Sequence, residues 1–311
     1  MSTTLKSLPR IVCILGPTGS GKNDLALALA DFFRIQIVNF DSRQVYKDLE
    51  VVTAQPTREE QEKCPHHLYG FLDPSREINA GTFVTWAKDS IAWAGKNDRV
   101  PVLVGGTGLY LQSLIYGLAP IPAVSESIRE QVLKRCRELG PEVLHRELQG
   151  IDPEYAAKIS SRDKQRVTRA WEVYLSSGRT LSQWHKDHDP CPAFRVLKLG
   201  VYLPQEELKV NLEKRIKRMI QKGAVQEVRQ VWRKNSFCRD LPGLAGIGCP
   251  EILDYLEGKL GFERCLQNWY RNTRKYAKRQ LTWFRKEPDV HWVLPYQVLE
   301  AKELIQDYLS S

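Results

Sequence analysis

The chain has 311 residues, of which 42% are apolar, and its 46 lysines and arginines outnumber its 37 acidic residues to give a net charge of +9. This length predicts two units, and no run approaches the ~20 apolar residues that a membrane helix needs. The seven cysteines lack C-x-x-C spacing and residues 1–10 hold no apolar signal segment. These features disfavour a disulfide framework and a secreted protein, so we expect a cytoplasmic protein that does not contact membranes.

The first predicted element is an apolar strand, 11–15, that runs directly into a glycine loop and then a helix. The loop and the start of the helix read Gly16, Pro17, Thr18, Gly19, Ser20, Gly21, Lys22 and Asn23. Glycines let the backbone aim several N–H groups at one ligand, while the helix N-terminus and the lysine add positive charge. The G-x-x-x-x-G-K spacing predicts a diphosphate or triphosphate site, and an ordinary glycine turn with a solvated lysine is the alternative.

Two residues near this loop are candidate ligands for Mg²⁺, which we expect as the cofactor. Asn23 stands where a Ser or Thr hydroxyl usually binds the metal, and its amide oxygen can take that place. Asp41 follows a buried strand predicted over 35–40. The carboxyl ends of strands form the ligand crevice of doubly wound folds, where a carboxylate can hold magnesium or accept a proton. From local sequence alone, Asp41 fits a helix N-cap equally well.

The next stretch of the core, 53–73, is polar and interrupted by prolines, which predicts a loop. A helix is predicted over 80–94 and a buried strand over 100–104, which leads into a Gly-Gly-Thr-Gly sequence at 105–108. In nucleotide hydrolases this strand ends in an acidic residue that helps to bind magnesium. Its absence argues against an ATP-driven motor and leaves Asp41 as the one obvious carboxylate near the phosphates. The glycines indicate either a close approach to the backbone or a tight turn.

Residues 120–192 have a different character, because charged helical patterns fill them and no strand pattern occurs. In the helix predicted over 163–177, Gln165, Arg166 and Arg169 share one face, which either contacts phosphates or is simply solvated. We therefore predict an α/β fold: a P-loop NTPase-like parallel sheet flanked by helices, with an inserted all-helical domain. The core is expected to comprise 1–119 and 193–311, and the insert 120–192 is expected to contact RNA.

The chain then returns to the core with a strand predicted over 195–203 and one long helix from Pro204 to about Trp232, with Arg229 near its end. Residues 264–286 hold eight basic residues, no acid and five aromatics. Cations suit phosphates and aromatic rings suit bases, so this stretch predicts a nucleic-acid surface, more particularly for RNA. A solvated basic helix is the alternative.

Taken together, these stretches resemble the tRNA dimethylallyltransferases, which attach a five-carbon prenyl group to an adenosine beside the anticodon. The resemblance covers nearly the whole chain and rests on Gly16 to Lys22, Asp41 to Tyr46, Thr53 to Pro56, Pro65 to Leu68, Gly105 to Tyr110, Gln165 to Arg169 and Asn272 to Phe284. The chain differs from the family pattern at Asn23, at Gln55, where the family has Lys, and at Cys249-Pro250, where it has Tyr-Lys.

The resemblance implies that the loop binds dimethylallyl diphosphate and that Lys22, Arg229 and Mg²⁺ stabilise the leaving diphosphate. It assigns proton acceptance from the adenine amine to Asp41 and a hydrogen bond near the bridging oxygen to Thr107. The residues that match tRNA contacts of the family, with two added from the basic stretch, are Asp41, Ser42, Arg43, Gln44, Thr107, Arg129, Gln165, Arg166, Val167, Thr168, Arg169, Arg274 and Lys278. The implied partners are the tRNA anticodon stem-loop and dimethylallyl diphosphate, and a monomer is expected.

Two other functions stay open from the sequence. A P-loop kinase of a small metabolite would consume ATP without RNA, and the basic aromatic stretch argues against it. A non-catalytic RNA-binding protein that has kept the phosphate loop would bind tRNA without modifying it.

Overall fold

The computed structural model describes residues 8–190 and 192–311. Two compact units divide the chain: a core unit of residues 1–115 and 192–311, and a helical unit of residues 116–191. In the described part of the chain, no helix is long and apolar enough to span a membrane.

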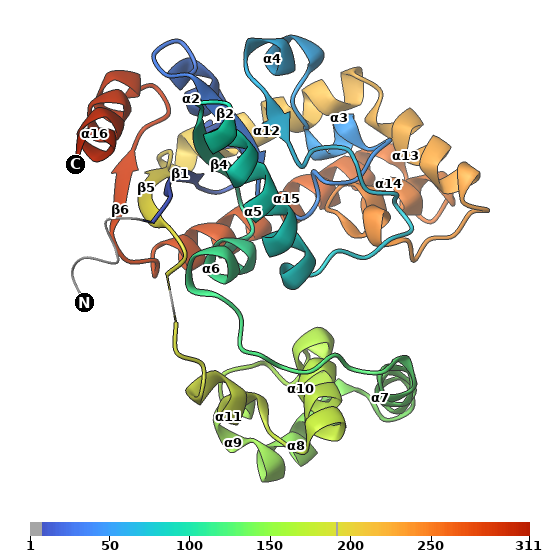
Figure 1. The fold of residues 1–311 in the computed structure, drawn as a ribbon. Coiled ribbons are helices and arrows are strands. Elements are labelled where there is room, and N and C mark those ends of the chain that lie inside the picture. The colour runs from blue at the N-terminus through green and yellow to red at the C-terminus, as the bar shows by residue number, and fades with distance from the viewer. Residues whose placement is uncertain (1–7, 191) are drawn as a thin grey trace. The chain divides into compact units, whose positions relative to one another are not determined.

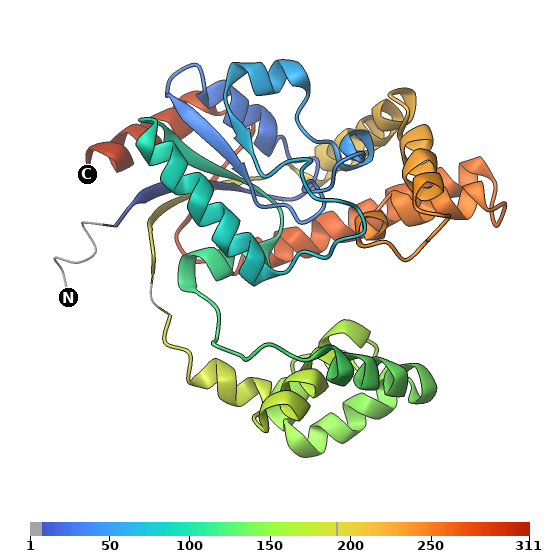
Figure 2. The same ribbon diagram turned by 45° about the vertical axis from the view of Figure 1, so that its right-hand side comes forward.

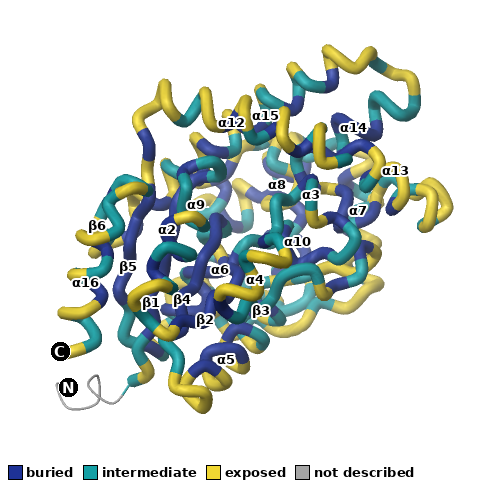
Figure 3. Tube along the Cα trace, turned by 90° about the horizontal axis from the view of Figure 1, so that it is seen from above, coloured by how far each residue is buried: buried dark blue, intermediate teal, exposed yellow. Residues whose placement is uncertain are grey.

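A six-stranded parallel sheet lies at the centre of the core unit, with the strand order β3-β2-β4-β1-β5-β6 (Figure 1). Its strands are β1 (Arg10–Leu15), β2 (Ile35–Asn39), β3 (His66–His67), β4 (Val100–Gly105), β5 (Arg195–Val201) and β6 (Val290–Val293). Val12 of β1 is in register with Val102 of β4 and Leu197 of β5. These strands read as nearly continuous apolar runs because both faces of the sheet are covered, and Figure 3 shows β1 and β4 buried along most of their length.

Helices cover both faces of this sheet. The helices α2 (Lys22–Leu29) and α16 (Val298–Ser310) pack against each other and against the strands. Their Leu25 and Ile305 join Val12 and Ile14 in one apolar cluster. The helix α5 (Ala80–Lys96) packs on β2 and β4 and lies on the other face in Figure 2. The confirmed parallel α/β architecture follows from this alternation of buried strands and amphipathic helices.

A second apolar cluster joins the remaining large helices of the core unit. Buried Val52, Ile216, Val228, Ile252 and Trp269 meet there. These residues come from five helices that are widely separated in the sequence. The helices of the core unit not yet named are α3 (Glu50–Thr53), α4 (Arg58–Lys63), α6 (Gly108–Tyr116), α12 (Gln205–Gln221), α13 (Ala224–Lys234), η1 (Pro242–Ala245), α14 (Cys249–Leu256) and α15 (Phe262–Phe284). This cluster holds α15 and α12 together beside the sheet.

The helical unit has its own core. It consists of α7 (Glu126–Leu139), α8 (Pro141–Ile151), α9 (Pro153–Ala156), α10 (Lys164–Ser177) and α11 (Leu181–Lys186). The helix α10 packs on α7 and α8. Val132, Leu144, Val167 and Trp171 are buried together, and the Trp171 indole N–H donates to the Leu144 carbonyl at 2.9 Å.

Two expectations about secondary structure were wrong, and some elements were not predicted. The long helix expected up to Trp232 is two helices, because Gly223 has φ +94° and ends α12. The stretch 53–73 contains α4, which a Thr57–Glu60 capping box begins, and the short strand β3. The elements β6, α11 and α16 were not predicted at all. Short strands such as β3 exist only through pairing with a neighbour, here Ile37 with His66, which periodicity does not reveal.

Candidate active site

The phosphate loop, residues 16–21, lies between β1 and α2 and is tightly packed on its outer side. Gly19 and Gly21 have φ of +79° and +85°, which favour glycine. A Cβ on Gly16 would lie 2.4 Å from the Val201 carbonyl oxygen, and one on Gly21 would lie 2.6 Å from Pro295 Cβ. The backbone therefore has room only for glycine at these positions. The N-terminus of α2, which starts at Lys22, supplies free N–H groups for an anion.

Asp41 and Thr107 lie side by side because β2 and β4 are neighbours in the sheet. The Ser42 N–H donates to Thr107 Oγ1 at 3.0 Å. Asn39 fixes the turn, since its Oδ1 accepts from the Asp41 N–H at 2.7 Å. Asp41 Oδ1 accepts from the Arg43 N–H at 2.9 Å, whereas no described residue hydrogen-bonds Oδ2. One oxygen of this carboxylate is thus held and the other is available to a ligand.

Two partly buried cations, Lys22 and Arg215, lie near this carboxylate. Burial lowers the pKa of Lys22 to about 8, although Asp41 raises it again in part and Arg215 lowers it further. Burial also lowers the pKa of Arg215, against the influence of Asp41 and Asp24. Two cations that are short of solvent and near one another favour a polyvalent anion between them. Sequence reasoning missed Arg215, which sits on α12 beside the apolar residue Ile216 and carries no motif.

Asn23 lines a cavity of about 10 Å³ together with Glu60, His66 and Tyr69. That volume holds about one water molecule. In the described part of the chain no hydrogen bond engages the Asn23 amide, and no group of three or more His, Cys, Asp or Glu could hold a metal. Mg²⁺ commonly takes only one or two carboxylates and completes its shell with phosphates and water. Asn23 and Asp41 therefore fit a magnesium ion only together with a phosphate ligand.

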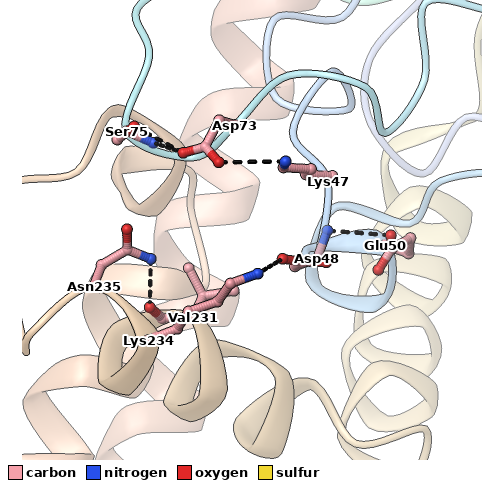
Figure 4. A network of polar contacts seen from close by, with 8 residues as sticks. All are labelled: Lys47, Asp48, Glu50, Asp73, Ser75, Val231, Lys234 and Asn235. Atoms are coloured by element: carbon pink, nitrogen blue, oxygen red, sulfur yellow. Dashed lines mark hydrogen bonds and ion pairs between the residues drawn. The ribbon is translucent and has the colours of Figure 1, made fainter.

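The segment that follows Asp41 is anchored to α13 and to the loop around Asp73. Figure 4 shows Lys47 paired with Asp73 at 3.3 Å and Asp48 paired with Lys234 at 3.0 Å. Glu227 of α13 accepts hydrogen bonds from the N–H groups of Val51 and Val52, each at 2.8 Å, and so holds the start of α3. These contacts fix the outer end of the segment that carries the Asp41 turn.

Glu227 should make stability depend on pH. Burial raises its pKa to about 7 in spite of its two backbone donors. A carboxyl whose pKa is higher in the folded than in the unfolded protein stabilises the fold fully at pH values below its unfolded pKa. For Glu227, this stabilisation of the fold is lost as the pH rises through about 7. We expect the unfolding free energy of the wild type to fall more steeply than that of Glu227→Gln between pH ~5 and ~8, measured by urea denaturation. Parallel pH profiles would contradict this role.

The candidate RNA-binding residues differ in how exposed they are. Arg274 and Lys278 are exposed on α15, where the Arg274 guanidinium lies over the Tyr270 ring at 5.6 Å. In the helical unit, Arg129, Gln165 and Arg166 are exposed and Arg169 is partly so. Both arginines of α10 have acidic neighbours, Asp163 for Arg166 and Glu172 for Arg169.

Four predicted site residues lie elsewhere than the predicted roles require. Val167 is fully buried, and Thr168 is buried with its hydroxyl donating to the Lys164 carbonyl at 2.8 Å, so both side chains serve the core of the helical unit. Gln44 is buried and its amide donates to the Ala54 carbonyl at 2.6 Å. Arg229 is exposed on α13, and within the described residues no contact ties it to the phosphate loop. Ser42 and Arg43 directly follow Asp41, where the Ser42 N–H donates to Thr107 Oγ1 and the Arg43 N–H donates to Asp41 Oδ1, and their contacts with tRNA stay a prediction.

Comparison with known proteins identifies similar sequences and structures. A family model described as IPP transferase matches residues 44–287. A tRNA dimethylallyltransferase of Maridesulfovibrio salexigens is 46% identical over 96% of this chain and 97% of its own, and one of Lawsonia intracellularis is 39% identical over 97% and 99%. A tRNA isopentenylpyrophosphate transferase of Bacillus halodurans has TM-score 0.71 at 30% identity, over 97% of both chains. A eukaryotic dimethylallyltransferase acting on tRNA has TM-score 0.82 at 29% identity, over 97% of this chain and 80% of its own.

Proposed function

The chain belongs to the IPP transferase family of tRNA dimethylallyltransferases, and from this premise we propose how it acts. It is a prenyltransferase that moves the dimethylallyl group of dimethylallyl diphosphate to the exocyclic amine of the adenosine on the 3′ side of the tRNA anticodon. The observation that carries this proposal is the convergence of a phosphate loop with a carboxylate that has one unengaged oxygen, Asp41 Oδ2. A cytoplasmic monomer is part of the same proposal.

The transfer exchanges one bond for another at the allylic carbon. The adenine nitrogen forms its bond to that carbon as the carbon–oxygen bond to diphosphate breaks, and the bonding pair leaves with diphosphate. Asp41 Oδ2 accepts the proton that the amine loses. The loop N–H groups, Lys22 and Arg215 stabilise the negative charge that develops on the leaving group. Arg215 takes the place that the sequence had given to Arg229, because Arg215 is near Lys22 and Asp41. Thr107, beside Ser42, is proposed to bind the bridging-oxygen region.

Holding the two substrates together supplies a large part of the rate. An adenine amine is a weak nucleophile, so its orientation at the allylic carbon matters more than its intrinsic reactivity. The base must leave its stack to reach Asp41, and extruding a base from a loop costs little. A site at the strand ends of the core unit therefore suits a nucleotide in an anticodon loop.

Magnesium is proposed as the cofactor, held by Asn23, Asp41 and the substrate phosphates. When bound it would neutralise charge on the diphosphate. We expect Asn23→Thr to keep or raise activity and to lower the Mg²⁺ concentration needed for half-maximal activity, because the variant restores the hydroxyl that such loops offer the metal. A magnesium titration of transfer activity measures this. A collapse of activity would show instead that Asn23 has a specific role in its small cavity.

Contacts with tRNA phosphates are proposed for Arg166, Arg169, Arg274 and Lys278. Each contact releases counterions, so neutralising one residue to Gln should reduce the slope of log affinity against log salt by up to about 0.9. All tRNAs should weaken alike, and the affinity for dimethylallyl diphosphate should stay unchanged. Filter binding over a salt series tests this, with the exposed Arg58→Gln on α4 as the matched control. Four unchanged slopes would mark these cations as merely solvated.

The function as a whole is tested by one incubation with unmodified tRNA. Labelled dimethylallyl diphosphate should label the tRNA without any need for ATP. Consumption of labelled ATP without RNA would support a small-molecule kinase. Binding of tRNA with no label transferred would support a non-catalytic RNA-binding protein.

A further inference from the structure

Gln280 of α15 is a buried polar side chain that links two loops of the site. It is 5% exposed. Its Oε1 accepts from the Thr18 N–H of the phosphate loop at 2.9 Å, and its Nε2 donates to the Gly106 carbonyl at 2.9 Å. One amide therefore joins the loop after β1 to the loop after β4, the loop that continues into Thr107.

The space around this amide is closely filled. A Cβ on Gly106 would lie 2.1 Å from Gln280 Nε2 and 3.5 Å from Asp41 Oδ2. Any side chain at position 106 would thus displace the amide or the backbone that it holds. Because both groups lie within 3.5 Å of this Cβ position, the Gln280 amide is close to the unengaged Oδ2 of Asp41, without a hydrogen bond between them. Gln280 is a neighbour of the reacting groups and not one of them.

Gln280 is a polar residue among apolar ones on the buried face of α15. Ala277 and Phe284, one turn away on either side, are apolar and buried, whereas Lys278 and Arg279 are exposed. An apolar residue at 280 would fill the same space but would leave the partly buried Thr18 N–H and the buried Gly106 carbonyl without their hydrogen-bond partner. The helix that presents cations to solvent thus holds both loops from its buried face.

We propose that Gln280 is a positioning residue for prenyl transfer, which fixes the phosphate loop and the Gly106–Thr107 segment at the separation where diphosphate and the acceptor amine meet. The proposal rests on the function proposed above. Gln280 takes no part in the chemistry and acts only by holding the two loops in position. That position matters because a displacement of about 1 Å between reacting groups can lower the rate ~100-fold.

The test compares Gln280→Met, which keeps the size but loses both hydrogen bonds, with Gln267→Met, an exposed glutamine on the same helix. We expect Gln280→Met to lower kcat roughly 10- to 100-fold. Its Kd for inorganic diphosphate should rise several-fold, since the loop is held less well. Its KM for tRNA should stay within about twofold, because no RNA contact is removed. Gln267→Met should match the wild type in all three quantities.

A second variant, Gln280→Glu, separates positioning from mere folding. The ionised carboxylate still accepts from Thr18 but cannot donate to Gly106, whereas the protonated form does both. Its activity relative to the wild type should therefore recover as pH falls. A wild-type kcat in folded Gln280→Met, or a raised KM for tRNA with kcat intact, would overturn the proposal, as would the absence of any pH-dependent recovery. If the wild-type protein transfers no prenyl group, the proposed function fails, while diphosphate affinity still tests the positioning.

Discussion

Asp41→Asn is expected to lower kcat by at least ~100-fold while the affinity for tRNA stays within about twofold, because a general base acts mainly in the transition state. Asparagine keeps the Oδ1 acceptor that the Arg43 N–H uses, so the turn after β2 should survive. It replaces the unengaged Oδ2 by an amide nitrogen that cannot accept a proton. Single-turnover kinetics with bound tRNA measure the chemical step directly. Asp41→Ala should show an equal or larger loss.

The matched control for this change is Asp89→Asn, an exposed aspartate on α5 that lies outside the site. Wild-type turnover is expected for this control. If instead Asp41→Asn lost tRNA affinity and kept its turnover, Asp41 would be a binding residue and the proton transfer proposed above would be wrong.

Lys22→Met should lower kcat by ~100- to 1,000-fold, the usual cost of removing one group that stabilises charge in the transition state. The wild type should also lose kcat/KM as pH rises through about 8, the value to which burial lowers the pKa of Lys22. Below that pH the ammonium is charged and binds diphosphate, and above it the amine is neutral. The variant should lack this alkaline decline, because methionine does not titrate.

The measurement is a pH profile of kcat/KM for dimethylallyl diphosphate at saturating tRNA. Lys96→Met, an exposed lysine at the end of α5, is the control and should reproduce the wild-type profile. Because dimethylallyl diphosphate is the substrate in every measurement, the titration of its own phosphates cancels when kcat/KM of the variant is divided by that of the wild type. An alkaline decline that persists unchanged in Lys22→Met would assign it to another group.

Several features of the fold could be predicted from short stretches of sequence. The apolar runs predicted four of the strands, since a strand buried on both faces needs no polar alternation. The glycines predicted a tightly folded loop between the first strand and its helix, and Gly19 and Gly21 have the positive φ that such a loop uses. The break between α12 and α13 was missed although Gly223 signals it, because the apolar periodicity continues on both sides of that glycine.

The residues that meet at the site were harder to predict, because two residues of the same type on similar helices can differ in whether the fold brings them to the site. Arg215 and Arg229 both lie on amphipathic helices of the core unit, yet only Arg215 is near Lys22 and Asp41, while Arg229 faces solvent. Within the motif 165–169, Val167 and Thr168 turn inward and their neighbours outward, as the helical period requires. The motif therefore identified a segment of the chain but did not predict which of its side chains can reach a ligand.

By itself, the sequence determined the phosphate loop, the parallel α/β class and the family, because each of these depends on conformational preferences and motifs that a few neighbouring residues encode. Only the tertiary structure decided which distant groups complete the site. Thr18 and Gln280 are 262 positions apart, and their hydrogen bond forms because α15 packs beside the strand ends. Local preference acts over one turn of helix or one loop, whereas the meeting of Gln280, Gly106 and Thr18 depends on how the whole core unit packs.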